Sequence, residues 1–208
     1  LVDSTRSVER QWRRWAAGHD IDGDALMRVV HGRRAADTIR DVAPHLDAER
    51  EVREVLGPAE AADTEGNVAI TGAAALLAAL PAGRWAVVTS GIPEVAASRL
   101  ASVGLPLPRV VVTAADVSRG KPDPEGYLLG AARLGVRPGR CVVLEDAPAG
   151  LAAARAAGAV SVGVATTHSP EALEADALVA TLADVRAAAV AGEIVLTLRE
   201  LVPQARPA

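Results

Sequence analysis

The sequence predicts an α/β protein in which a doubly wound parallel sheet is joined to a small all-helical unit. Two observations carry this prediction. After Gly72, short runs of β-branched residues alternate with Ala-rich helical stretches, which is the pattern of a parallel sheet with crossover helices. Before about residue 70, apolar residues recur at helical spacing and no strand pattern is seen.

The N-terminal unit, residues 5–70, is expected to contain helices alone. Val8, Trp12 and Trp15 stand at i, i+4 and i+7, which indicates an amphipathic helix. The two tryptophans are expected to form the core of this unit rather than to stack on a ligand. Shorter helices are expected around residues 26–30, 38–42 and 52–56, the last of them closed by Gly57-Pro58.

The rest of the chain, residues 1–4 and 71–208, is expected to form the α/β domain. Its predicted strands are the apolar runs at residues 86–88, 110–112, 141–144 and 160–164, with a further weakly alternating strand at residues 193–198. The intervening helices are expected to end at Gly104, Gly135 and Gly158, because a glycine after the last periodic residue is typical of a helix C-terminus.

The composition excludes several classes of function. The chain of 208 residues has 22 basic and 26 acidic side chains, so its net charge of −4 offers no field for nucleic acid. The single cysteine, Cys141, excludes an intrachain disulfide and fits a cytoplasmic location. No apolar run has transmembrane length and no signal peptide is recognisable, so a soluble monomer with no membrane partner is expected.

Ligands of doubly wound sheets bind beyond the carboxyl ends of the strands, so the residues after each strand are the candidate site. Thr89 and Ser90 follow the first strand, and their hydroxyls with the backbone before Gly91 suit a phosphate group. The alternative is that these hydroxyls cap the following helix, near Pro93.

Lys121 follows the second strand, in a loop bounded by Gly120 and Pro122. A lysine ammonium is a compact charge that suits phosphate oxygens, and the alternative is a solvated surface lysine. The loop is not a P-loop, because Pro122 stands where Ser or Thr is required.

Glu145 and Asp146 follow the third strand. Two adjacent carboxylates at the end of an apolar strand need a partner, and oxygen ligands of this kind suit Mg²⁺. The alternative is that Asp146 caps the next helix while Glu145 is exposed.

Together these segments resemble the haloacid dehalogenase superfamily, in particular its branch of sugar phosphatases and β-phosphoglucomutase-like enzymes. The resemblance rests on Val87-Val88-Thr89-Ser90, on Gly120-Lys121-Pro122-Asp123-Pro124 and on Val143-Leu144-Glu145-Asp146-Ala147-Pro148-Ala149-Gly150, which are similar to the family's second, third and fourth motifs. It covers nearly the whole chain and implies a Rossmann-like core with a helical cap, here residues 5–70, between the first and second motifs.

The first motif is where the chain departs from the family. Leu1-Val2-Asp3-Ser4 resembles the tail of the family pattern Asp-x-Asp-Gly-Thr-Leu-Val-Asp-Ser. The nucleophilic Asp and the acid/base Asp are therefore expected before Leu1, together with the first core strand. The given chain is accordingly expected to be inactive by itself.

The resemblance implies an Mg²⁺-dependent phosphatase that hydrolyses a small sugar or polyol phosphate through an aspartyl-phosphate. Thr89, Ser90 and Lys121 would hold the phosphoryl group, and Asp146 with Glu145 would hold the metal.

The cap would select the substrate, with Arg33 and Arg34 as candidate contacts, although two solvated arginines are an equally good interpretation. A phosphomutase uses the same core and remains an alternative, as does a non-catalytic phosphate-binding protein.

Overall fold

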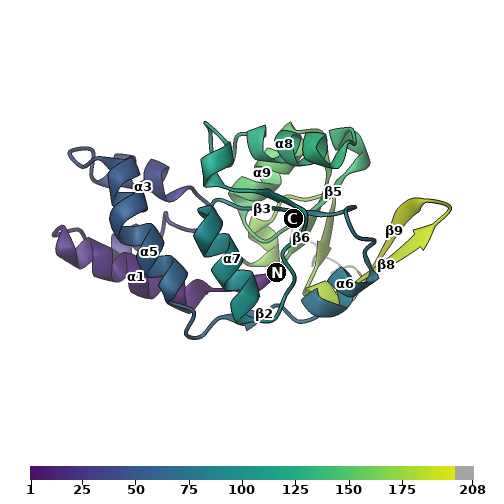
Figure 1. Ribbon diagram of the computed structural model, residues 1–208, viewed down its shortest axis with the longest axis horizontal. Coiled ribbons are helices and arrows are strands. Elements are labelled where there is room, and N and C mark those ends of the chain that lie inside the picture. The colour runs from purple at the N-terminus through teal and green to yellow at the C-terminus, as the bar shows by residue number, and fades with distance from the viewer. Residues whose placement is uncertain (200–208) are drawn as a thin grey trace, which may run out of the picture.

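The computed structural model describes residues 1–199 and shows a helical part beside an α/β part (Figure 1). The predicted strand at residues 193–198 is present, whereas residues 200–208 of the expected α/β domain lie outside the described residues. None of the helices within residues 1–199 is both long and apolar enough to cross a membrane.

The helical part gathers around one apolar cluster, which contains Trp12, Trp15 and Ile39, all almost fully buried. Both tryptophans therefore belong to the core of this part, as expected. Its elements are α1 (Thr5–Gly18), α2 (Gly23–Met27), α3 (Ala35–Val42), α4 (Ala48–Glu51), the π-helical turn η1 (Val52–Leu56) and α5 (Gly57–Ala62).

The expectation that Gly57-Pro58 closes a helix is wrong. The chain runs from η1 straight into α5, and Pro58 occupies the first turn of α5. Proline is tolerated there, because the first amides of a helix have no carbonyl partner within it. Gly57 is required for packing, since a Cβ at this position would lie 2.5 Å from the carbonyl oxygen of Val52 and 2.5 Å from Cδ1 of Ile92.

The α/β part contains two groups of parallel strands. The pair consists of β3 (Ala86–Val88) and β4 (Val110–Val112), and the trio of β5 (Val142–Glu145), β6 (Val160–Val164) and β7 (Ala177–Val179). The long helices of this part are α6 (Ala73–Ala79), α7 (Pro93–Ser102), α8 (Glu125–Leu134) and α9 (Pro148–Ala156). Short 3-10 turns lie at η2 (Ala114–Asp116), η3 (Pro138–Arg140), η4 (Pro170–Ala172) and η5 (Leu182–Asp184).

The pair and the trio are not hydrogen-bonded to each other within the described residues. Between β3 and β5 lies a cavity of about 1700 Å³, and its lining includes Val87 and Val88 on one side and Val143 and Leu144 on the other. Each of the two facing strands therefore has one edge without a strand partner. Unpaired edges of this kind are the surfaces to which another strand adds.

Two antiparallel ribbons complete the fold. The strands β1 (Val2–Asp3) and β2 (Val68–Ala69) pair, so the two segments that enter and leave the helical part lie side by side. The expectation of helices alone in residues 5–70 is therefore wrong at the end of that range, where β2 lies. The strands β8 (Val185–Val190) and β9 (Glu193–Leu198) form a hairpin that projects from the α/β part (Figure 1). Its turn, Ala191-Gly192, has positive φ at both residues, which matches the twist of a tight hairpin.

Candidate active site

Thr89 and Ser90 stand at the carboxyl end of β3 and line the cavity. The alternative that they cap the next helix is wrong, because the N-cap of α7 is Ile92 and no side chain caps it. Thr89 Oγ1 instead accepts a hydrogen bond from the Gly91 amide at 3.1 Å, which forms a tight turn. Ser90 Oγ donates to the carbonyl of Gly32 at 3.1 Å and so contacts the helical part.

Lys121 reaches across the gap between the two strand groups. Its Nζ lies 2.7 Å from Oε2 of Glu145 and 3.4 Å from the carbonyl oxygen of Val88. The side chains of Lys121 and Glu145 are only 12% and 9% exposed, so neither the solvated lysine nor the exposed glutamate of the alternative interpretations is present. The ion pair therefore joins the loop that precedes α8 to the end of β5.

Lys121 and Glu145 each stabilise the charged form of the other. Burial opposes the charge on Lys121, but attraction to Glu145 outweighs it and raises the pKa of the ammonium. Burial likewise opposes the charge on Glu145, and the nearby ammonium reverses this effect and lowers the pKa of the carboxyl. Lys121 is therefore a fixed positive charge and Glu145 a fixed negative charge at neutral pH.

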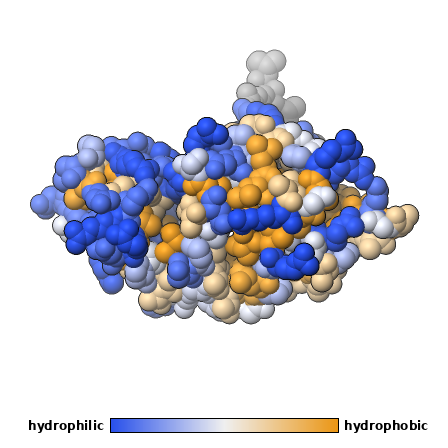
Figure 2. Space-filling view, turned by 45° about the horizontal axis from the view of Figure 1, so that its top comes forward, coloured by the Kyte–Doolittle hydropathy of each residue, from blue (hydrophilic) through white to orange (hydrophobic). Residues whose placement is uncertain are grey.

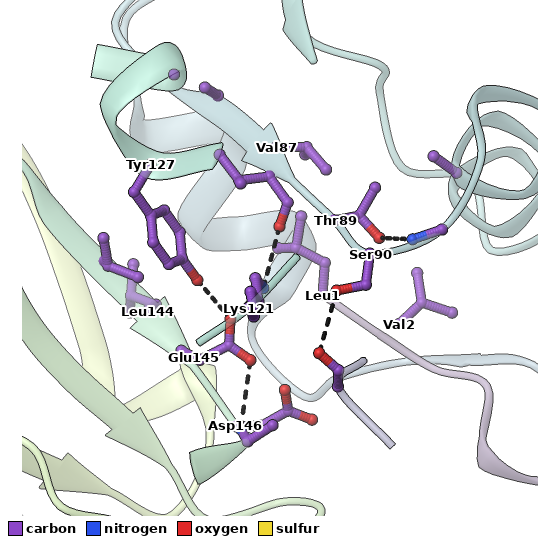
Figure 3. Close-up of a pocket in the computed structure, with 18 of the residues that line it drawn as sticks. Leu1, Val2, Val87, Thr89, Ser90, Lys121, Tyr127, Leu144, Glu145 and Asp146 are labelled. Carbon is purple, nitrogen blue, oxygen red and sulfur yellow. Dashed lines mark hydrogen bonds and ion pairs between the residues drawn. The ribbon is translucent and has the colours of Figure 1, made fainter. Parts of the chain in front are cut away.

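Tyr127, in the first turn of α8, is the third member of this cluster. Its hydroxyl donates to Oε2 of Glu145 at 2.6 Å, and the Lys121 ammonium lies 5.2 Å from the centre of its ring. Burial raises the pKa of the Tyr127 hydroxyl, so it remains a donor. In Figure 3 the Tyr127 hydroxyl and the Lys121 side chain both lie next to the Glu145 carboxylate.

Gly150 gives Glu145 the room that it occupies. A Cβ at residue 150 would lie 2.1 Å from the carboxyl carbon of Glu145, so the side chain packs directly on the backbone of the first turns of α9. Any larger residue at this position would displace the carboxylate from Lys121.

Asp146 is not part of the Lys121 ion pair and has hydrogen-bond partners of its own. Its carboxylate does not cap α9, whose N-cap is Ala147, so the capping interpretation is wrong. The Thr167 hydroxyl donates to Oδ2 of Asp146, and Nδ1 of His168 lies 3.0 Å from the Asp146 carbonyl. Both partners come from the loop after β6, which fixes the direction of the Asp146 side chain.

The acidic pair thus divides into two roles. Both oxygens of Glu145 have partners, since Oε1 accepts from the Ala147 amide at 3.3 Å. Asp146 is the carboxylate that remains available to a cation. Residues 1–199 contain no cluster of three or more acidic, His or Cys side chains that would form a metal cage. One or two carboxylates completed by water and substrate phosphate are, however, the usual protein ligands of Mg²⁺, so the donors present fit that ion.

Arg33 and Arg34 lie in the segment of residues 31–34, here named the cap loop, which lines the same cavity as Lys121. Arg33 forms an ion pair with Asp41 at 2.6 Å and is one-third exposed. Arg34 is more buried and contacts both Asp37 and the α/β part. The structure therefore brings both arginines to the rim of the cavity with different environments.

The strands bring Thr89, Ser90, Lys121, Glu145 and Asp146 together at one end of the cavity (Figure 3). Sequence reasoning did not assign roles to Tyr127, Thr167 or Gly150. Tyr127 is the chain's only tyrosine and stands six residues after Lys121, and this proximity could have indicated a place in the site. Thr167 follows the fourth core strand, and the rule that strand ends carry the site extends to it.

Comparison with known proteins agrees with this site. The family model of haloacid dehalogenase-like hydrolases matches residues 1–158. The chain is 42% identical over 191 residues to hexitol phosphatase A of Escherichia coli, covering 88% of this chain and 87% of that protein. It is 41% identical over 195 residues to validoxylamine A 7'-phosphate phosphatase of Streptomyces hygroscopicus, covering 89% and 91%.

A solved structure, a hydrolase from Pseudomonas syringae, matches the fold with a TM-score of 0.78 and 25% identity over 88% of this chain and 90% of that one. The predicted fold class is thereby confirmed. The prediction of a phosphatase is confirmed as well, because both named relatives of high identity are phosphatases. The chain belongs to the haloacid dehalogenase-like hydrolases.

Proposed function

We propose that this protein hydrolyses a small sugar or polyol phosphate with the help of Mg²⁺. The observation that carries the proposal is the placement of Thr89, Lys121 and Asp146 at the adjoining ends of β3 and β5, around one cavity. Hydroxyl, ammonium and carboxylate are the groups that position a phosphoryl group and balance its charge. The two named relatives support the substrate class, since one is a hexitol phosphatase and the other a validoxylamine A 7'-phosphate phosphatase.

The cap, residues 5–70, is proposed to enclose the alcohol part of the substrate. Arg33 and His31 line the cavity from the cap loop and offer donors to hydroxyl groups. The rest of the cap side of the cavity includes apolar side chains such as Val8 and Leu56. The hydroxyls of a small polyol could bind these polar groups. Because the polyol part carries no charge, its contact with the apolar side chains would bury no unpaired charge.

The attacking carboxylate is proposed to lie on a strand that fills the space between β3 and β5. Within residues 1–199 neither facing edge has a strand partner, and the cavity between them is lined by Val87, Val88, Val143 and Leu144. A central strand is flanked by apolar side chains on both faces, which matches this lining. The Asp-x-Asp segment expected before Leu1 would supply it. The chain together with that strand is referred to below as the active enzyme.

In this mechanism the residues described here bind and orient rather than react. Thr89 donates its hydroxyl to a phosphoryl oxygen, and Lys121 places a fixed ammonium beside the phosphoryl group. Glu145 and Tyr127 hold Lys121 in that position. Asp146 would hold Mg²⁺, with Thr167 orienting its carboxylate. The ion, when bound, neutralises negative charge on the phosphoryl group.

The first experiment combines intact mass with phosphate release. A mass above 21.3 kDa for the natural protein, with an Asp-x-Asp sequence at its N-terminus, is expected. That protein should release phosphate from a hexitol phosphate when Mg²⁺ is present and not when it is chelated, whereas the 208-residue chain should release none. Turnover by the 208-residue chain alone would contradict the assignment of the nucleophile. Failure of the longer protein on all polyol phosphates would contradict the substrate class.

A sugar phosphomutase is the second candidate, because the same core residues would serve it. Product analysis with a hexose 1-phosphate separates the two. Free phosphate is expected for the phosphatase, and isomerised sugar phosphate would establish the mutase instead.

A further inference from the structure

The cap loop touches three separate loops of the α/β part. Arg34 donates from Nη1 to the carbonyl of Val117 at 2.8 Å, in the loop that leads to Lys121. Ser90 Oγ donates to the carbonyl of Gly32 at 3.1 Å. A Cβ on Gly32 would lie 3.0 Å from the Cβ of Ala147, beside the acidic pair. This short loop is therefore in contact with every strand end that forms the phosphate site.

Arg34 makes the strongest of these contacts, and its geometry is fixed. Asp37, one turn into α3, accepts from both Nε and Nη2 at 2.8 Å each. This two-point pairing orients the guanidinium plane so that Nη1 faces the α/β part. The Arg34 side chain is only 13% exposed, and the hydrogen bonds that it donates to Asp37 raise its pKa further. A lysine would keep the charge but lose the fixed direction.

The Arg34 side chain packs directly against the backbone of Gly120. A Cβ at residue 120 would lie 2.7 Å from Cγ of Arg34 and 2.9 Å from Oδ2 of Asp37. The φ of Gly120 is outside the left-handed region, so the backbone would accept alanine. Glycine is thus needed here for the close approach of Arg34, and not for its conformational freedom. Its neighbour in the sequence is Lys121.

The opposite side of the cap is attached differently. There α5 packs along α7, with Ser98 Oγ donating to the carbonyl of Ala61 at 2.6 Å. Arg99 pairs with Glu60 at 3.1 Å, and both side chains are largely buried. One side of the cap is therefore held by two packed helices. On the cap-loop side, the hydrogen bonds to the α/β part within residues 1–199 are the Ser90 bond and the bond from the Arg34 guanidinium, and neither belongs to the packing of α5 on α7.

We propose that Arg34 is the latch that holds the cap closed over the phosphate site and thereby fixes the loop that carries Lys121. In this role it is a positioning residue rather than a substrate ligand, which leaves Arg33 and His31 as the substrate-facing side chains of the cap loop. The structural part of this inference is independent of the proposed function, and its effect on turnover rests on that function.

Hydrogen exchange of the 208-residue chain tests the latch without any activity. The variant Arg34→Ala removes the hydrogen-bond donor. The variant Gly120→Ala keeps Arg34 but adds a Cβ that pushes its side chain away from residue 120. Both should speed exchange of the Ser118 and Arg119 amides, which are bonded to Glu125 beside the latch, by about tenfold or more. Exchange of the Ala43 amide in the cap core should not change.

Arg33→Ala is the matched control, because Arg33 is adjacent in sequence but pairs only with Asp41 on the cap. Equal exchange in Arg34→Ala and Arg33→Ala would overturn the latch. If Arg34→Ala fails to fold, Gly120→Ala and Arg34→Lys provide the same comparison. Arg34→Lys should show an intermediate rate, since one donor replaces the fork.

The active enzyme adds a kinetic comparison. In Arg34→Ala, kcat/KM for a hexitol phosphate should fall about tenfold more than kcat/KM for p-nitrophenyl phosphate, whose planar leaving group needs no polyol contacts. An equal loss on both substrates would contradict a role in closing the cap. If the unchanged enzyme does not turn over hexitol phosphate, the proposed function is contradicted. The role of Arg34 in holding the cap is still tested by hydrogen exchange, which does not depend on activity.

Discussion

The apolar cluster of the cap and the surroundings of the cavity in the α/β domain bury different kinds of side chain. The cap interior holds the edge-to-face pair Trp12 and Trp15, whose ring centres are 5.7 Å apart, together with aliphatic residues such as Ile39. The α/β domain has an interior of Ala, Val and Leu, yet beside its cavity it buries the ion pair of Lys121 and Glu145. On the face drawn in Figure 2 the cap surface is largely hydrophilic, whereas apolar side chains gather over the α/β domain.

This difference suggests that the cap core contributes mainly to the stability of the fold and the buried charges of the α/β domain mainly to the site. Apolar packing in the cap lowers the free energy of the folded state directly. A buried ion pair adds little net stability, because removing two charges from water costs about as much as their attraction returns. The buried charges of the α/β domain fit the proposed phosphate site, and substitutions in the two regions should have separable effects.

The largest effect is expected for Asp146→Asn in the active enzyme. The amide removes the negative charge that would hold Mg²⁺, so kcat with Mg²⁺ should fall by about a thousandfold or more. The temperature of unfolding should stay close to that of the unchanged protein, because Asp146 is not part of the Lys121 ion pair. The measurement is phosphate release against Mg²⁺ concentration, and undiminished release would refute the metal assignment.

Lys121→Met should be nearly inactive and also less stable. The variant leaves the Glu145 carboxylate buried without its partner, which costs about 3–5 kcal/mol of unfolding free energy. The double variant Lys121→Met/Glu145→Gln should recover most of this stability and none of the activity. Urea unfolding and phosphate release measure the two effects. A rise in KM with kcat unchanged would show that Lys121 does not act in the transition state.

Ile39→Ala tests the cap in the same way. Ile39 is fully buried in the cap cluster, so the cavity left by alanine should cost about 2–5 kcal/mol. Ile39→Val should cost about 0.5–1.5 kcal/mol. Activity per folded molecule should be nearly unchanged in both, as measured by phosphate release well below the unfolding temperature. A loss of kcat in either Ile39 variant without a loss of stability would contradict the claim that the cap core affects stability and not chemistry.

The smallest effect concerns Asp63, at the end of α5. Hydrogen bonds from Arg10, at 2.8 and 2.6 Å, lower its pKa from 3.8 to about 2. A lowered folded-state pKa contributes stability above pH 3.8 that is lost as the pH falls toward 2. The stability difference between the unchanged chain and Asp63→Asn should therefore shrink over this window. Urea unfolding at several pH values would show a constant difference if the ion pair were unimportant.

The sequence determined which strand ends carry the site. Thr89, Lys121 and Asp146 could be placed together because the carboxyl ends of parallel strands share one edge of a sheet. The buried tryptophans of the cap followed from helical spacing in the same way. Gly57-Pro58 was misjudged, because proline in a first turn and proline after a helix end are alike in sequence.

Only the tertiary structure decided how these residues divide their work. Glu145 and Asp146 are adjacent at the end of β5, and which of them meets Lys121 and Tyr127 depends on how α8 packs. The Arg34 contact with Val117 joins residues 83 positions apart, and it exists because Gly120 allows the cap to approach. Periodicity and motif spacing are local properties of the chain, whereas the partner of a buried charge is set by which elements the fold brings together.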